Sequence, residues 1–473
     1  MDFSSMLKYR FGFFAHIENI PMLSHYDSLN GWKKQRFDQL TVHVHPEVEV
    51  TSAVGTLRSI VVVGTIYSVS GREVNALIDD LSSSSTLKCG DFLTQVSGRF
   101  ALFSIEKSGD VSVYHDAFGS RSIFYSEKSP GFVASHAGLI AEMLGISKDK
   151  KIIEFMSCPE YNARTVKYLP GDLSLWEGVR SLIPNNFLKL NSSKCVRYWP
   201  VRPRRTGSYA DLFHSYDSHI KGLIENLVGR FVVVGITGGI DTRAVFAAMF
   251  KYGLPFSGVT WTGNYIKEKE IDSINQIVDI LGISHNFMDM QGGFQKEVAE
   301  FAGINSGGYR GKSRLAALMH AHYKPMNGVF VRGYGGEIIR GFYNLSKIPM
   351  QDFTASAMTK AYGSSIKNVN PNAEYIKFVE DAFEQYRYRA NYEGIEKFCF
   401  EPSDIFYWEH RMGVWGSAML NEIDPAIYNL VGMNGRELYE CAFSLAKEER
   451  LTKRILAKVS DEYSDALTAV PYF

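Results

Sequence analysis

The stretch FVVVGITGGIDTRAVFAAMF, residues 231–250, decides the fold class of this chain. Four β-forming residues run into a glycine-rich turn, and an apolar helical pattern follows. A turn that opens a helix after a buried strand presents free backbone N–H groups and the positive end of the helix dipole, which favour an anion such as phosphate. Gly238 and Gly239 would let the backbone approach the phosphate closely, and Thr237 and Thr242 would add hydroxyl donors.

The same turn holds an acidic residue and no lysine. It matches neither the GxxxxGK[ST] phosphate loop nor the GxGxxG turn. Asp241 would repel phosphate unless a divalent cation lay between them, so the sequence predicts Mg²⁺ at this carboxylate. The alternative is a tight strand–helix connection without a ligand, in which Asp241 is a partner of the helix dipole.

The bulk properties of the chain narrow the class of protein. Its 473 residues carry 51 basic and 51 acidic side chains, and no long run of one sign occurs. This balance gives no support to a partner that is a nucleic acid or an anionic membrane. No run of 18 apolar residues occurs, the first residues lack a signal-peptide layout, and the five cysteines are scattered singly. We therefore expect a cytoplasmic protein.

Two regions of different texture follow one another along the chain. Residues 1–200 are predicted to be β-rich, with short strands such as SIVVVGTIYSV, FALFSI and RSIFYS between Gly, Ser and Asp turns. Residues 209–473 begin with strands that alternate with helical patterns, which indicates a parallel α/β sheet. From about residue 370 the chain is predicted to be mostly helical. The Pro- and Arg-rich segment RYWPVRPRRTGSYADL, residues 197–212, is predicted to connect two domains.

Two glycine-rich segments carry a resemblance to known synthetases. TGGIDT resembles the SGGxDS pyrophosphate-binding motif of the ATP pyrophosphatase superfamily, with Thr in place of Ser at both ends. VFVRGYGGEIIRGFY, residues 329–343, resembles the GEGSDE segment of asparagine synthetases. With the register set on Gly333 and Gly335, Glu337 falls at the aspartate that helps to bind Mg²⁺-pyrophosphate in that family. Tyr334 falls at its active-site glutamate, where β-lactam and carbapenam synthetases carry tyrosine.

The resemblance to those two synthetases implies a pair of proton acceptors. There a Tyr–Glu pair deprotonates the attacking amine, and AMLNEIDP, residues 418–425, resembles the segment that supplies the glutamate, which nominates Glu422. A phenol with a pKa of about 10 is a poor base at pH 7 unless a carboxylate relays the proton. A packing tyrosine at Tyr334 and a surface or helix-capping carboxylate at Glu422 are the alternatives.

The same resemblance assigns a nucleotide-binding role to one more segment, and the role of one arginine stays open. VTWTGNY, residues 259–265, follows a strand at the level where relatives hold adenosine through backbone contacts, which places Val259 and Thr260 in the nucleotide site. Arg243 stands where a small or apolar residue is usual. It could meet a phosphate, meet an acidic substrate, or pair with a neighbour.

The N-terminal region resembles the glutaminase-type domain of asparagine synthetases. The stretch VSGRFALFSIEKSGDVSVYHDAFGSRSIFYS, residues 96–126, contains its D-x-F-G-x-R-x-x-x-Y pattern. The resemblance implies an α/β protein with an N-terminal αββα domain of the Ntn type, followed by a PP-loop domain of the adenine-nucleotide α-hydrolase type with a helical C-terminal part. Glutamine hydrolysis there needs a cysteine exposed by removal of Met1. Position 2 is Asp2, so we expect no glutaminase activity.

These observations predict an AMP-forming amide ligase that uses ATP and Mg²⁺. Its substrate would be a small molecule or peptide with a carboxylate and an amine, joined within or between molecules, as in β-lactam, lactam or macrocycle formation in natural-product biosynthesis. The family's C-terminal lysine has only Lys453 and Arg454 as weak substitutes, which puts β-lactam closure in doubt. An amidotransferase supplied with ammonia by a separate subunit, a sulfur transferase and a non-catalytic binding protein are the alternatives, and a homo-oligomer stays open.

Overall fold

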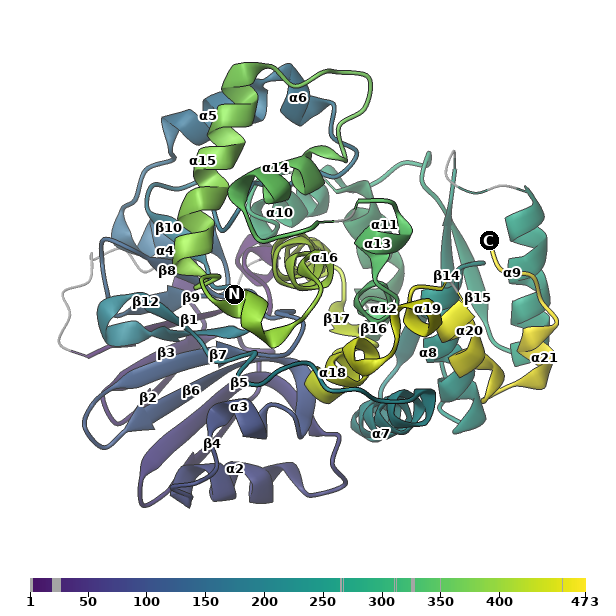
Figure 1. Cartoon of the computed structure of the whole chain (residues 1–473), viewed down its shortest axis with the longest axis horizontal. Coiled ribbons are helices and arrows are strands. Elements are labelled where there is room, and N and C mark those ends of the chain that lie inside the picture. Colours follow the sequence, from purple (N-terminus) through teal and green to yellow (C-terminus); the bar gives the residue numbers. More distant parts are fainter. Residues whose placement is uncertain are drawn as a thin grey trace.

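The computed structural model describes residues 3–18, 27–263, 266, 268–309, 311, 313–324, 328–348, 350–452 and 454–473. Within these residues the chain forms a mixed α/β fold with three sheets. Two six-stranded antiparallel sheets come from the first 200 residues, and a five-stranded parallel sheet comes from the rest (Figure 1). The strands predicted on each side of residue 200 are therefore confirmed in type.

The two antiparallel sheets pack face to face and are covered by helices on their outer faces. Phe13 of one sheet contacts Phe103 of the other with ring centroids 5.9 Å apart. In β5, Val61 and Val63 face the other sheet while Ile60 and Val62 face outward, as the two-residue period of a strand requires. The first sheet has the order β10 (Val179–Ser181), β8 (Phe124–Ser126), β9 (Phe132–Ala134), β1 (Phe13–Ile17), β3 (Leu40–Val44) and β2 (Lys33–Phe37). The second has the order β12 (Lys194–Arg197), β11 (Asn186–Lys189), β7 (Val111–His115), β6 (Val96–Glu106), β5 (Arg58–Ser68) and β4 (Val50–Val54).

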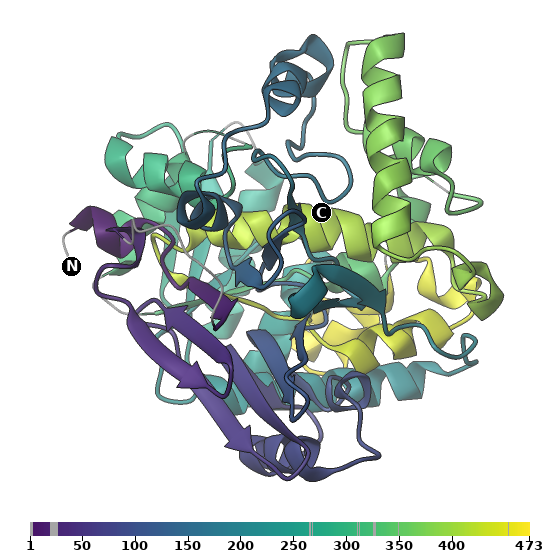
Figure 2. The same cartoon turned by 90° about the vertical axis from the view of Figure 1, so that its left-hand side faces the viewer.

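The outer helices complete four layers. Helix α4 (Ala137–Leu144) packs on the first sheet, and α2 (Val74–Ser83) and α3 (Cys89–Phe92) pack on the second. In both views α2 lies below the antiparallel sheets (Figure 1, Figure 2). The layer order is helix, sheet, sheet, helix, and its assignment to the glutaminase type stays a prediction. The remaining elements of this region are α1 (Phe3–Leu7), η1 (Asp27–Leu29), α5 (Lys150–Ser157), α6 (Pro159–Asn162) and η2 (Leu190–Ser192).

The parallel sheet is buried on both faces. Val232 and Val234 of β13 face α8, whereas Val233 faces the opposite side. Such burial explains the unbroken apolar run of this strand. The strand order is β15 (His285–Asp289), β14 (Ser257–Thr262), β13 (Val232–Gly235), β16 (Val329–Arg332) and β17 (Tyr428–Val431). The helices among these strands are α7 (Tyr209–Leu227), α8 (Ile240–Lys251), α9 (Glu268–Leu281), α10 (Lys296–Asn305) and α11 (Arg314–Tyr323).

The C-terminal region is mostly helical, as predicted, but it also supplies the edge strand β17, which the sequence reading missed. Four residues without a period-two pattern gave too weak a signal. The helices are α12 (Gly336–Ile339), α13 (Phe342–Leu345), α14 (Ala355–Gly363), α15 (Ala373–Arg389), η4 (Ile395–Phe398), α16 (Pro402–Phe406), the π-helix η5 (Tyr407–Gly416), α17 (Ser417–Ile423), α18 (Arg436–Ser444), α19 (Lys447–Arg450), α20 (Arg454–Asp461) and α21 (Asp465–Thr468). Of the helices that the structure describes, none is long and apolar enough to cross a membrane.

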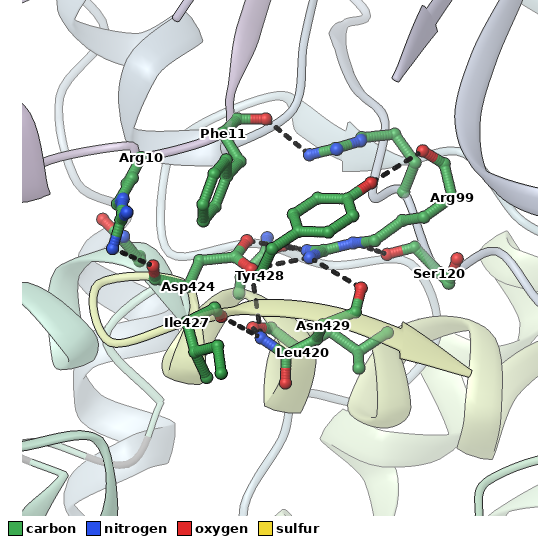
Figure 3. A network of polar contacts seen from close by, with 12 residues as sticks. Arg10, Phe11, Arg99, Ser120, Leu420, Asp424, Ile427, Tyr428 and Asn429 are labelled. Carbon is green, nitrogen blue, oxygen red and sulfur yellow. Dashed lines mark hydrogen bonds and ion pairs between the residues drawn. The ribbon is translucent and has the colours of Figure 1, made fainter. Parts of the chain in front are cut away.

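A buried polar network joins the antiparallel sheets to the segment after α17 (Figure 3). Arg99 of β6 donates two hydrogen bonds to the carboxylate of Asp424, at 2.6 and 2.7 Å, and a third to Asn421 at 2.9 Å. The side chains of Arg99 and Asp424 are both fully buried. Asn429 of β17 donates to the same carboxylate at 3.2 Å. The network therefore fixes the end of α17 against the N-terminal half of the chain.

Candidate functional site

The predicted anion loop lies between β13 and α8, with Gly239 as the residue before the helix. The side-chain oxygen of Thr237 accepts a hydrogen bond from the backbone of Gly239 at 3.2 Å and is 2.8 Å from the hydroxyl oxygen of Thr242. The backbone N–H of Gly238 donates to the carboxylate of Glu270, on α9, at 3.4 Å. A loop amide thus already meets a negative group, as a helix start of this kind favours.

The second glycine turn, after β16, packs directly on the first. A Cβ atom added at Gly333 would lie 2.7 Å from the backbone nitrogen of Thr242, and one at Gly336 would lie 2.5 Å from a carboxylate oxygen of Asp241. Gly335 has φ +97°, a conformation that favours glycine, and its backbone lies against the carbonyl of Met433. Two turns that are about 95 residues apart in the chain therefore meet at the carboxyl ends of neighbouring strands.

The two predicted metal-binding carboxylates meet at this junction. Arg340 donates to both oxygens of Asp241, each at 2.9 Å. Burial and, to a smaller extent, the charge of Asp241 raise the pKa of Glu337 to about 7, against the opposing charges of Arg340 and Arg411. One buried carboxylate oxygen of Glu337 has no hydrogen-bond partner in the described part of the chain. Both groups are hard oxygen ligands that a cation would stabilise, so they fit Mg²⁺.

The donor set is small for a metal held by protein alone. Among the described residues there is no group of three or more His, Cys, Asp or Glu side chains that could hold a metal ion. Mg²⁺ commonly binds through one or two carboxylates together with phosphate oxygens and water. Asp241 and Glu337 suit that arrangement and not a dedicated protein cage.

Tyr334 lies in an aromatic setting at the edge of the second turn. Its hydroxyl accepts a hydrogen bond from Arg332 at 2.7 Å, and the guanidinium of Arg332 lies 4.2 Å from the ring centroid. The ring of Phe118 stacks on it at 6.2 Å with an interplanar angle of 9°, and the ring of Trp415 lies at 6.0 Å. Phe118 belongs to the D-x-F-G-x-R stretch, so the N-terminal half forms part of the wall of the site.

Glu422 is buried near the end of α17 and accepts a hydrogen bond from the hydroxyl of Ser313 at 2.6 Å. Buried carboxylates of this kind are uncommon unless they are hydrogen-bonded. The surface-carboxylate alternative for this residue is therefore wrong. Its action as a pair with Tyr334 stays a prediction.

Val259 and Thr260 lie in β14, next to the strand that leads into the anion loop. The carbonyl of Val259 accepts from the backbone of Ile236 at 2.9 Å, and the hydroxyl of Thr260 donates to the carbonyl of Ile236 at 2.6 Å. Both side chains are buried, whereas Trp261 and Thr262 keep part of their surface. The two predicted residues thus hold the start of the loop, and a nucleotide role for them stays a prediction.

Arg243 contacts the C-terminal segment of the chain. It is fully buried and donates to the carbonyls of Leu467, Val470 and Pro471 at 3.3, 2.6 and 2.9 Å. The backbone N–H of Phe473 then donates to the carbonyl of Gly238 at 2.9 Å. Of the roles considered for Arg243, a pairing with neighbouring residues is the one observed, and it holds residues 467–473 against the anion loop.

Several residues of the site were missed in the sequence. Glu270 and Arg411 belong to no quoted segment, and only folding brings them to the glycine turns, whereas Arg340 lies in the second segment but received no role. A partial signal was available for Arg340, which follows Glu337 by three residues on a short helical segment. Asp2, on which the expected lack of glutaminase activity rests, and Lys453, a substitute for the family's C-terminal lysine, lie outside the described residues. Arg454 is exposed.

The fold and the site together define a mixed α/β protein in which two glycine-rich turns at the carboxyl ends of neighbouring parallel strands each hold one acidic residue, Asp241 and Glu337. No protein-family model and no curated protein matches the sequence. Solved structures that share features of the fold include three synthetases. They are NMN synthetase from Francisella tularensis (13% identity, TM-score 0.21, 40% of this chain and 96% of that chain), NH3-dependent NAD synthetase from Campylobacter jejuni subsp. jejuni (12%, 0.22, 43% and 93%) and glutamine-dependent NAD+ synthetase from Acinetobacter baumannii (11%, 0.20, 56% and 60%). At these TM-scores the likeness carries no argument about the fold or the activity.

Proposed function

We propose that this chain is an ATP-dependent, AMP-forming amide ligase that activates a substrate carboxylate and joins it to an amine. The observation that supports this function best is the junction of the two glycine turns. It brings Asp241 and Glu337 to the start of α8, where backbone amides favour an anion. An anion loop with two carboxylates beside it suits pyrophosphate bound together with a divalent cation.

In the activation step, an oxygen of the substrate carboxylate attacks the α-phosphorus of ATP. The bond from the α-phosphorus to the bridging oxygen breaks, and pyrophosphate leaves with the electron pair. Loop 237–242 would bind the leaving pyrophosphate through its N–H and hydroxyl groups. Bound Mg²⁺ would neutralise the charge that develops there. Asp241 and Glu337 are the residues that would hold the ion, and Arg340, which donates to Asp241, is a planar cation that can also donate to a phosphate oxygen.

In the second step, an amine attacks the activated carbonyl and must lose a proton. Tyr334 and Glu422 are the proposed proton acceptors. Arg332 donates to the hydroxyl of Tyr334 at 2.7 Å and so fixes the position of that oxygen. AMP then departs with the electron pair of the acyl–oxygen bond. The amine is proposed to come from a substrate and not from glutamine, because position 2 is aspartate.

The test is release of pyrophosphate and AMP from ATP-Mg²⁺ across a panel of amino acids and peptides that carry a carboxylate and an amine. We expect release that depends on the added compound and that Asp241→Asn abolishes. The control Asp381→Asn changes an exposed aspartate of α15 and should leave release unchanged. Tyr334→Phe should retain pyrophosphate release at a single turnover and slow amide formation.

Two results would contradict the proposal. One is wild-type protein that binds no ATP-Mg²⁺ in calorimetry, which would favour a non-catalytic binding protein. The other is equal release by the wild type and Asp241→Asn, which would place any hydrolysis at another site. A strong preference for free ammonia over every amine would instead favour an amidotransferase with a separate ammonia source.

A further inference from the structure

The π-helix η5 presents two side chains toward the site, Arg411 and Trp415. The other eight residues of η5 are buried, whereas these two keep part of their surface. They are four residues apart, and the guanidinium carbon of Arg411 lies 4.1 Å from the ring centroid of Trp415. π-helical turns are rare and occur frequently at functional sites, because they re-aim side chains that an α-helix would direct elsewhere.

Arg411 differs from three other arginines whose side chains are largely buried. Arg99, Arg197 and Arg450 each form an ion pair with a carboxylate. Within the described ranges of the chain, no ion pair joins Arg411 to an acidic side chain, and its near neighbours are the rings of Trp415 and Tyr168, at 4.1 and 5.4 Å. A largely enclosed cation that no carboxylate contacts is costly, so such a group favours an anionic ligand.

Burial tends to lower the pKa of Arg411, but the neighbouring hydroxyls of Tyr168, Tyr343 and Tyr407 together outweigh it, and the net shift of the pKa is upward. The group therefore stays charged. It is also a planar donor that can meet both oxygens of a carboxylate at once.

The position of Arg411 links the two halves of the proposed reaction. On one side its charge reaches Glu337, where it opposes the rise in pKa that burial causes. On the other side Trp415 lies against Tyr334, with ring centroids 6.0 Å apart. The buried indole N–H of Trp415 has no hydrogen-bond partner in the described part of the chain. The guanidinium of Arg411 and the indole N–H of Trp415 thus lie between Glu337, a predicted Mg²⁺ ligand, and Tyr334, a predicted proton acceptor.

We propose that Arg411 binds the substrate carboxylate before activation and its carbonyl oxygen afterwards, with Trp415 as a flat wall for the adjoining part of the substrate. This inference rests on the proposed function. The guanidinium keeps its proton throughout and only donates hydrogen bonds. When the amine attacks, the carbonyl oxygen gains negative charge, which Arg411 stabilises more than it stabilised the neutral carbonyl. The expected substrate has a planar or apolar group next to the carboxylate.

The test uses two probes, ATP-Mg²⁺ and 5′-O-(N-benzoylsulfamoyl)adenosine, a stable analogue of an aromatic acyl-adenylate. Binding of both is measured by calorimetry for the wild type, Arg411→Met and Arg411→Lys. We expect Arg411→Met to bind ATP-Mg²⁺ within about threefold of the wild type but the analogue about 10- to 100-fold more weakly, as loss of a charged hydrogen bond predicts. The affinity of Arg411→Lys for the analogue should lie between the affinities of the wild type and of Arg411→Met, because lysine keeps the charge but lacks the planar pair of donors.

Arg387→Met is the matched control. It removes an arginine of α15 that forms an ion pair with Glu384, one helical turn away, and should change neither affinity. Unchanged ATP-Mg²⁺ binding by Arg411→Met also shows that the variant is folded. The inference is overturned if the analogue binds Arg411→Met as tightly as the wild type, or if both ligands weaken equally. Wild-type protein that binds neither ligand would overturn the proposed function and this inference with it.

Discussion

Replacement of Arg99 by methionine should reveal how strongly the N-terminal half supports the candidate site. Arg99 and Asp424 are fully buried, and two hydrogen bonds of 2.6 and 2.7 Å join them (Figure 3). Methionine fills similar space but leaves the carboxylate of Asp424 charged and without its cation. Removal of one partner from a buried ion pair costs about 3–5 kcal/mol. Since Asp424 follows Glu422 by two residues, the end of α17 should also loosen.

The chain offers a control with the same ion-pair distance in a different environment. Arg72 and Asp80 are also 2.6 Å apart, but both side chains are about half exposed, at 51% and 52%. Arg72→Met should cost less than about 1 kcal/mol, because water screens an exposed pair. The double variant Arg99→Met with Asp424→Leu removes both charges of the pair, so its loss of unfolding free energy should be smaller than that of Arg99→Met alone.

The assay is urea unfolding followed by tryptophan fluorescence. Trp408 reports on the interface, because it is fully buried and its indole N–H donates to the carbonyl of Ala117 at 2.7 Å. Equal free energies of unfolding for Arg99→Met and Arg72→Met, within 1 kcal/mol, would refute the reasoning. So would a double variant less stable than Arg99→Met, since that would mean that no buried charge had been left without a partner.

Two further predictions concern the glycine junction and the response to acid. Gly333→Ala should weaken ATP-Mg²⁺ binding by more than tenfold in calorimetry, because the added Cβ would lie 2.7 Å from the backbone of Thr242. The control is Gly363→Ala, where an added Cβ meets nothing within 4 Å. Equal affinities of the two variants for ATP-Mg²⁺ would contradict the packing argument. Burial lowers the pKa of His219 to about 4, against the hydrogen bond to the Gly432 carbonyl. As the pH falls, His219 is protonated in the unfolded chain before it is protonated in the folded one. The contribution of His219 to the free energy of unfolding is therefore present above pH 6.5 and is lost as the pH falls toward 4, by about 2 kcal/mol between pH 6.5 and 5. The slope of unfolding free energy against pH should be smaller in His219→Gln, and an unchanged slope would show that other groups dominate.

The local features of the site could be predicted because they depend on short-range chemistry. A glycine-rich turn between an apolar strand and a helix has one physical use that is common, and Gly238, Gly239 and Asp241 form it within six residues. The same holds for the second turn, where glycine is needed for a positive φ at Gly335. Strand type on each side of residue 200 followed from alternation and from apolar runs.

The partners of those residues could not be predicted, because they come from distant parts of the chain. Arg340 pairs with an aspartate 99 positions earlier, and Arg243 binds carbonyls more than 220 positions later. Nothing in the local sequence distinguishes an arginine that will find a carboxylate from one that will not, as Arg99 and Arg411 illustrate. The edge strand β17 could not be predicted for a similar reason. It is a strand because its backbone pairs with β16, whereas its own sequence pattern does not indicate one.

By itself, then, the sequence determined where the two glycine-rich turns would form and which carboxylates they would hold, because turn geometry acts over a few residues. The tertiary structure alone decided which turns meet, that the N-terminal half supplies Phe118 to the wall of the site, and that Arg411 stays without a carboxylate partner among the described residues. Those facts depend on packing across hundreds of residues. Burial, which sets the cost of each charge, exists only once that packing has formed.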